Sequence, residues 1–121
     1  MTVVALHHVQ LAMPPGGEIR ATDFYEGLLD IPRVVKPPHL EGRGGCWFET
    51  ETVRIHLGVE EDFRPAAKAH PAFHVEDLES VKQRFVDAGV EVVDDQPPPG
   101  YGRFYASDPF GNRIELLSPA E

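Results

Sequence analysis

Short stretches of alternating apolar and polar residues recur along the chain and predict β-strands. The first is expected over residues 3–13, where Val9 and Leu11 alternate with His8 and Gln10. Apolar residues at helical spacing, among them Phe24, predict a helix over 19–29. Further strands are expected over 33–36, 45–50 and 52–60. The first half is therefore predicted to run β-α-β-β-β.

The second half repeats this order. A strand is expected over 72–75, a helix over 77–88 with Gly89 as its terminator, and strands over 91–94, 103–107 and 113–118. The last two strands are joined by residues 108–112, where Pro109 presets φ and Gly111 accepts a positive φ. The second half is thus predicted to have the same β-α-β-β-β order as the first.

Sequence echoes support a duplication. Residues 53–57, VRIHL, are echoed by NRIEL at 112–116, and His8-Val9 is echoed by His74-Val75. An extra Pro- and Gly-rich loop over 13–17 accounts for the longer spacing in the first half. Each echo places a side chain that can bind a metal at a matching position in the two modules.

The length of 121 residues fits one domain with a single shared core. We expect one domain over residues 1–121, with module one over about 1–61, a linker over about 62–69 and module two over about 70–121. The apolar stretches are too short to cross a bilayer. These features favour a small soluble protein.

Charge and cysteine content narrow the expected partners. Twenty acidic residues against 11 Lys and Arg give a net charge of −9, which argues against binding to nucleic acid or anionic membranes. A small molecule is the expected partner. The single cysteine, Cys46, cannot form an intrachain disulfide, and the N-terminus lacks a secretory signal pattern. We therefore expect a cytoplasmic protein in which Cys46 packs in the interior.

Four polar side chains interrupt apolar strand patterns, namely His8, His56, His74 and Glu115. If helices cover the apolar faces, all four lie on the opposite face. Imidazole and carboxylate groups are ligands for Zn, Fe, Ni or Mn. A single strand histidine is more often a packed or solvent-facing residue, and this alternative stays open, above all for His56. The three histidines without a repeat partner, His7, His39 and His70, are interpreted as surface or core residues.

The pattern resembles the vicinal oxygen chelate superfamily, which includes glyoxalase I, extradiol dioxygenases, fosfomycin-resistance thiol transferases and bleomycin-binding proteins. The motifs that carry the resemblance are His8-Val9, Phe24-Tyr25, Leu28-Leu29, His74-Val75, the 108–112 turn and Ile114-Glu115-Leu116. The resemblance implies an α+β fold in which two βαβββ modules form an open, cup-shaped, eight-stranded mixed sheet with the helices outside. It also implies a homodimer.

The same resemblance implies that His8, His74 and Glu115 bind one divalent metal ion of unknown identity (Zn, Ni, Fe or Mn). His56 is the fourth candidate ligand and lies where glyoxalase I enzymes usually carry a glutamate. Isomerisation of a hemithioacetal needs a base that moves a proton between adjacent carbons, so Glu115 or His56 is the expected catalytic base. A site with three histidines and one glutamate should favour an anionic, chelating substrate.

Four more residues are candidates for substrate binding, namely Gln10, Trp47, Arg103 and Tyr105. Gln10 shares the face of His8, and the other three lie on strands expected to line the cup. Core packing is an equally good interpretation of Trp47 and Tyr105. For Arg103 the alternative is a solvated surface charge.

The leading hypothesis is a metal-dependent enzyme, similar to glyoxalase I, that acts on a small substrate with adjacent oxygens. An extradiol-type dioxygenase with Fe(II) ranks lower, because no additional acid-base histidine is clearly placed. Fosfomycin-type thiol transfer ranks lower still. The alternative from another class is a metal-free binding or resistance protein similar to the bleomycin-binding proteins.

Overall fold

The computed structural model describes residues 2–120, which form two compact units that meet between Arg64 and Pro65. We call residues 2–64 unit 1 and residues 65–120 unit 2. Each unit contains one four-stranded sheet. No helix in the described part of the chain is long and apolar enough to cross a membrane.

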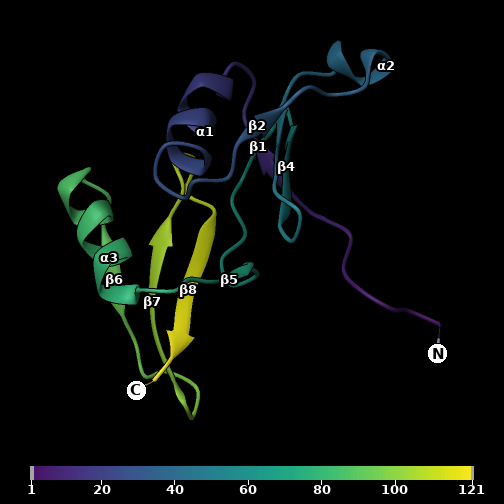
Figure 1. The fold of residues 1–121 in the computed structure, drawn as a ribbon. Coiled ribbons are helices and arrows are strands. Elements are labelled where there is room, and N and C mark those ends of the chain that lie inside the picture. Colours follow the sequence, from purple (N-terminus) through teal and green to yellow (C-terminus); the bar gives the residue numbers. More distant parts are fainter. Residues whose placement is uncertain (1, 121) are drawn as a thin grey trace. The chain divides into compact units, whose positions relative to one another are not determined.

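Unit 1 contains four strands and two helices (Figure 1). In chain order they are β1 (Val9–Met13), α1 (Glu18–Tyr25), β2 (Arg33–Val34), α2 (Pro38–Glu41), β3 (Cys46–Glu49) and β4 (Arg54–Val59). The strand order in the sheet is β1-β4-β3-β2. β1 and β4 are parallel and the other two pairs are antiparallel, so the sheet is mixed.

One face of this sheet packs against α1, and we call it the helix face. The rings of Tyr25 on α1 and Phe48 on β3 lie 5.4 Å apart, and both side chains are fully buried. Ile55 is the cross-strand partner of Phe48 and is buried on the same side. These contacts remove large apolar surfaces from water and thereby stabilise the unit. The opposite side is the open face.

Unit 2 has the same order without the short second helix (Figure 1). Its elements are β5 (Ala72–His74), α3 (Leu78–Asp87), β6 (Val92–Asp94), β7 (Tyr101–Ser107) and β8 (Arg113–Pro119). The strand order is β5-β8-β7-β6, with a parallel β5/β8 pair. Phe85 of α3 contacts Phe104 of β7 edge to face at 5.7 Å, and both are fully buried. The helix face of unit 2 is therefore the side of Phe104.

Local sequence signals fix the ends of several elements. The Asp77 side chain accepts a hydrogen bond from Ser80 N at 3.1 Å and caps α3. Gly89 follows the helix with φ +78°. In the turn before β8, the Asp108 carboxylate accepts hydrogen bonds from the backbone N–H groups of Phe110 and Asn112, while Gly111 has φ +92°. The expected helix terminator and turn are thus confirmed.

The predicted α+β class and the repeated β-α-β-β-β order are confirmed as two open, mixed four-stranded sheets. Two local predictions were wrong. The first strand begins at Val9 rather than Val3, because its partner β4 begins only at Arg54. The helix α2 was not expected, although its N-terminal Pro38 suits the first turn of a helix.

Candidate functional site

The strand registers place the candidate residues of unit 1 on the open face. His56 lies between Gln10 of β1 and Trp47 of β3 on the same rung of the sheet. Neighbouring residues alternate faces, and Ile55 and Leu57 are buried on the helix face, so His56 and its partners lie on the open face. His8 is two residues before Gln10 and belongs to the same side.

Three rings form a column on this face. The Trp47 and His56 rings stack with centroids 3.9 Å apart and an angle of 3°, and the His56 and His8 rings stack at 4.4 Å and 19°. His56 Nε2 lies 2.7 Å from Glu49 Oε2, within hydrogen-bonding distance. Only 4% of the His56 surface is exposed. The imidazole is therefore held on both faces and at one edge.

The pKa of His56 is held below its ordinary value. Burial is the largest cause, because loss of water disfavours the charged imidazolium. The hydrogen bond to Glu49 acts in the opposite direction, and the neighbouring His8 lowers the pKa further. The ring is therefore neutral at neutral pH, which is the form that binds a metal or accepts a proton.

Unit 2 presents a charged cluster around Glu115. This residue lies on the same rung as Ala72 of β5 and Tyr105 of β7. Its carboxylate is 2.9 Å from His70 Nε2 through Oε1 and 3.4 Å from Arg103 Nη1 through Oε2. Glu115 is only 6% exposed. Both carboxylate oxygens thus have partners, one of which sequence analysis did not place in the site.

Arg103 and Tyr105 line this cluster. The Arg103 Nη2 donates to Gln96 O at 2.6 Å, and the guanidinium carbon lies 5.0 Å from the Tyr105 ring centroid. The guanidinium of Arg113 lies 4.7 Å from the same ring centroid, and the His70 ring meets it edge-on at 5.3 Å. Arg103 Nε is buried without a hydrogen-bond partner. Arg103 is therefore a largely buried cation, unlike an ordinary solvated surface charge.

The registers identify His70 as the repeat equivalent of His8. His56 is paired with Gln10, and Glu115 is paired with Ala72 in the corresponding parallel ladder. His8 and His70 each precede those partners by two residues. His74 is on the same side of the sheet but is exposed and paired with Leu117. A ligand role for His74 stays a prediction, whereas the repeat position belongs to His70.

The position of His70 was missed because His74-Val75 repeats the letters of His8-Val9. The spacing within each first strand was a second signal. His70 lies two residues before Ala72-Phe73, just as His8 lies two residues before Gln10-Leu11. Glu49 was also missed, although it follows Trp47 at the strand spacing of two. Neither residue can be selected without the strand register.

The donor types suit a divalent metal, but they are divided between the units. Unit 1 brings His8 and His56 together, and unit 2 brings His70 and Glu115 together. Within either unit, over residues 2–64 or 65–120, no three His, Cys, Asp or Glu side chains gather closely enough to hold an ion. Each unit therefore provides one pair of donors, which we call its half-site. Neutral imidazoles with one carboxylate are a suitable set for Zn, Fe, Ni or Mn.

A hollow lies beside the ring column on unit 1. It has a volume of about 180 Å³, and its lining includes Gln10, Trp47 and Gly58 together with the cationic Lys36 and Arg43. The Gln10 side chain lies over Gly58, where a Cβ atom would come within 2.5 Å of the amide nitrogen. Gly58 thus leaves room for Gln10. The hollow is a candidate substrate pocket with two positive charges.

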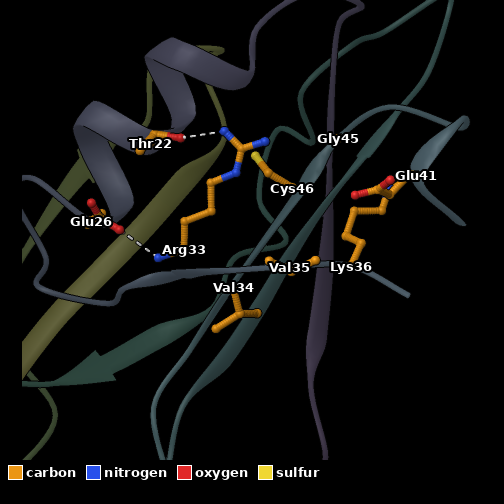
Figure 2. Close-up of a pocket in the computed structure, with 9 residues that line it drawn as sticks. All are labelled: Thr22, Glu26, Arg33, Val34, Val35, Lys36, Glu41, Gly45 and Cys46. Carbon is orange, nitrogen blue, oxygen red and sulfur yellow. Dashed lines mark hydrogen bonds between the residues drawn. The ribbon is translucent and has the colours of Figure 1, made fainter. Parts of the chain in front are cut away.

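A second, larger cavity of about 670 Å³ lies on unit 1 where α1 meets the sheet (Figure 2). Arg33 extends from β2 toward α1 and donates through Nη1 to Thr22 Oγ1 at 3.2 Å, with the Cys46 sulfur beside it. Cys46 is 1% exposed, and burial raises its thiol pKa. The buried position confirms the packing expected of Cys46, and the raised pKa disfavours the reactive thiolate.

Comparisons with known proteins agree with this architecture. A model of the Glyoxalase/Bleomycin resistance protein/Dioxygenase superfamily matches residues 6–116. No curated protein matches the chain. Among solved structures, a protein from Bacillus anthracis described as a glyoxalase family member is 44% identical, with a TM-score of 0.94 over 99% of this chain and 98% of that chain.

More distant structures share the fold. Lactoylglutathione lyase from Agrobacterium tumefaciens is 21% identical with a TM-score of 0.74, over 98% of this chain and 96% of that one. TnmS3, an antibiotic binding protein from Streptomyces sp. CB03234, is 20% identical with a TM-score of 0.74, over 99% of both chains. The family match spans most of the sequence, and the Bacillus anthracis structure covers almost all of it. This chain belongs to the Glyoxalase/Bleomycin resistance protein/Dioxygenase superfamily.

Proposed function

We propose that the protein is a divalent-metal-dependent enzyme that acts on a small anionic substrate with adjacent oxygen atoms. The observation that supports this most is the equivalence of the two half-sites. His8 and His56 in unit 1 occupy the same register positions as His70 and Glu115 in unit 2. One member of each pair, His56 or Glu115, is buried, and burial of such polar groups is costly unless they serve binding or chemistry.

In this proposal His8, His56, His70 and Glu115 are the metal ligands. His70 replaces His74 in the set that sequence analysis predicted. When bound, a divalent ion acts as a Lewis acid that stabilises negative charge developing on substrate oxygens. The metal is one of Zn, Ni, Fe or Mn.

The residues of this chain have separate tasks in the proposed reaction. Glu115 or the neutral His56 accepts the proton that leaves the substrate carbon. Lys36 and Arg43, beside Gln10 and Trp47, provide positive charge for an anionic substrate. In unit 2, Arg103 and Tyr105 are the proposed substrate contacts. Glyoxalase-like isomerisation is the favoured reaction, and extradiol-type dioxygenation is the second.

Metal content of the full-length, untagged protein tests this proposal. Calorimetry with each metal and elemental analysis should give about one ion per chain for the wild type. Loss of a residue that only supports a metal ligand lowers metal affinity by up to roughly 100-fold. His70→Ala removes a ligand itself, so it should lower metal affinity by at least about that factor. His74→Ala is the matched control and should bind as the wild type does. The opposite pattern would restore His74 to the ligand set.

A second candidate function is binding of a small molecule without chemistry and without a metal. The specific observation in its favour is that Glu115 already has Arg103 and His70 as partners, so both of its carboxylate oxygens are satisfied without an ion. A wild-type protein that binds none of the four metals would overturn the enzyme proposal and leave this one. If metal binds, assays with hemithioacetals and catechols distinguish isomerisation from oxygen uptake.

The proposed assembly is a homodimer in the cytoplasm, with each chain forming one domain. The homodimer is proposed from the resemblance to the vicinal oxygen chelate superfamily. Light scattering on purified protein tests the mass, and a monomer would overturn the dimer. Fractionation of cells tests the location. A single cooperative unfolding transition is expected for one domain.

A further inference from the structure

His56 is immobilised by three neighbours in unit 1. Trp47 covers one face of its ring and His8 covers the other. Glu49 occupies its edge, with Oε2 at 2.7 Å from Nε2. The side-chain exposure is 5% for His56 and 26% for Glu49. One ring nitrogen of His56 is therefore already engaged, which restricts how this histidine can take part in chemistry.

The chemistry of a carboxylate decides which nitrogen carries the proton. An ionised carboxylate only accepts hydrogen bonds, so Nε2–H of His56 must donate to Glu49. A separation of 2.7 Å is typical of a hydrogen bond strengthened by charge. In the neutral ring, Nδ1 then carries the free lone pair.

We propose that Glu49 is a positioning residue that holds His56 in its Nε2–H tautomer, so that Nδ1 is the atom His56 offers to a metal or a proton. The use of Nδ1 rests on the function proposed above, whereas the tautomer itself does not. Nδ1 is bonded to Cγ and lies nearer the backbone than Nε2. A ligand at Nδ1 would consequently lie closer to the sheet than one at Nε2.

The surroundings of Glu49 reserve it for His56. Its cross-strand partner is Arg54, a natural ion-pair partner for a carboxylate. Arg54 Nη1 instead donates to the backbone oxygen of His7 at 3.2 Å. In the described part of the chain, His56 is the side chain that pairs with Glu49. The carboxylate is thus directed to the imidazole.

His8 carries an analogous constraint in the same column. Its Nδ1 lies 2.9 Å from His7 Nδ1, so one of these two nitrogens donates to the other. Where His8 Nδ1–H is the donor, Nε2 of His8 carries the free lone pair and is the atom that remains for a ligand. The two stacked imidazoles would therefore use different ring nitrogens, because Glu49 engages Nε2 of one and His7 engages Nδ1 of the other.

NMR of the metal-free protein with labelled histidine nitrogens tests the assignment. In the wild type, His56 should show a protonated Nε2 with slow solvent exchange and an unprotonated Nδ1. Glu49→Gln preserves shape but replaces the charged acceptor with an amide that can also donate. Exchange of the Nε2 proton should become about tenfold faster, because the charge-assisted bond is roughly twice as strong as a neutral one. Glu51→Gln, at an exposed neighbouring carboxylate, is the matched control and should change nothing.

Two results would overturn the proposal. One is a wild-type spectrum in which His56 carries its proton on Nδ1, which needs no variant to fold. The other is an exchange rate of the His56 proton that Glu49→Gln leaves unchanged. Because the protein is metal-free in both measurements, neither result depends on whether the metal-enzyme proposal is correct.

If the protein binds metal, the binding atom can be read directly. Cadmium NMR distinguishes the nitrogens, because a metal at Nε2 is close in bonds to both ring carbon protons and a metal at Nδ1 is close to only one. We expect coupling from His56 to one ring proton. Coupling to both would show metal at Nε2 and would overturn the use of Nδ1.

Discussion

The two half-sites occupy equivalent positions but are stabilised by different forces. In unit 1 the donor His56 is neutral and is held by stacking between Trp47 and His8. In unit 2 the donor Glu115 is ionisable and is held between Arg103 and His70. Aromatic contact fixes the first, and charge pairing fixes the second.

This difference shows that a repeated backbone position does not require a repeated chemistry. Unit 1 fixes a ring whose pKa is lowered by burial, so its donor carries no charge at neutral pH. Unit 2 fixes a buried carboxylate by means of the Arg103 guanidinium and the His70 imidazole. Substitutions in unit 2 should therefore leave unpaired charges, and substitutions in unit 1 should mainly leave space.

The largest expected effect is that of Glu115→Ala. Removal of the carboxylate leaves the largely buried Arg103 with weaker partners, and breaking such a pair costs roughly 3–5 kcal/mol. We expect a loss of about 3 kcal/mol in the free energy of unfolding, at the lower end of that range because Gln96 O still binds Arg103. Urea unfolding measures this change.

The matched change in unit 1 is His56→Ala. It removes two stacked ring contacts and should lower the free energy of unfolding by about 2 kcal/mol. The loss is smaller than for Glu115→Ala, because the Glu49 carboxylate left without its partner is partly exposed and water can solvate it. The comparison fails if His56→Ala destabilises the protein as much as Glu115→Ala does.

Trp47 and Tyr105 lie at corresponding places, one in each unit, and provide a finer test. Trp47→Ala should lower the free energy of unfolding by about 2 kcal/mol. This is less than the loss expected for a fully buried aromatic residue, because the indole is only partly buried. Tyr105→Ala should cost about 1 kcal/mol, since its ring meets His70 edge-on and its other contacts are cationic. Thermal and urea unfolding measure both, and equal losses would contradict the contrast between stacking and charge.

The helices also differ between the units. Asp77 caps α3, whereas Gly17 begins α1 without a side-chain cap. Asp77→Ala should lower the free energy of unfolding by about 1 kcal/mol. Glu76→Ala at the adjacent exposed residue is the control and should have little effect. A capping contribution of zero would show that α3 is held by Phe85 packing alone.

The smallest expected effect is a pH dependence that originates in unit 1. The folded-state pKa of His56 lies below the unfolded value of about 6.5, so the unfolded chain binds more protons between the two values. The contribution of His56 to stability is therefore fully present above about pH 6.5 and is lost as the pH falls toward the lowered pKa. Urea unfolding at several pH values should show a weaker dependence in His56→Leu than in the wild type. An identical dependence would assign the effect to other groups.

The fold could be predicted because it depends on local patterns. Period-two alternation, the Asp77 cap and the Gly111 turn are visible in short stretches of sequence. The extent of β1 could not be predicted, because it depends on where its partner β4 begins. Strand length in a sheet is decided by the pair of strands.

The candidate site could be predicted in part, for the same reason. Alternation placed His56 and Glu115 opposite their apolar neighbours, and the registers agree with that placement. The importance of His70 and Glu49 depends on which residue of another strand lies beside each. That information is held in the register, which a single sequence does not display.

The parallel pairing of first and last strands also determines when each sheet can form during synthesis. β1 is made early, yet its partner β4 completes unit 1 only when Val59 has been added. Until then the backbone groups at the edge of β1 have no strand to pair with. The sheet must wait for a contact between residues that are distant along the chain. The same delay recurs between β5 and β8. The hydrogen bonding of the unit 1 sheet thus needs no residue of unit 2, and it can be completed before the last strand, β8, has been translated.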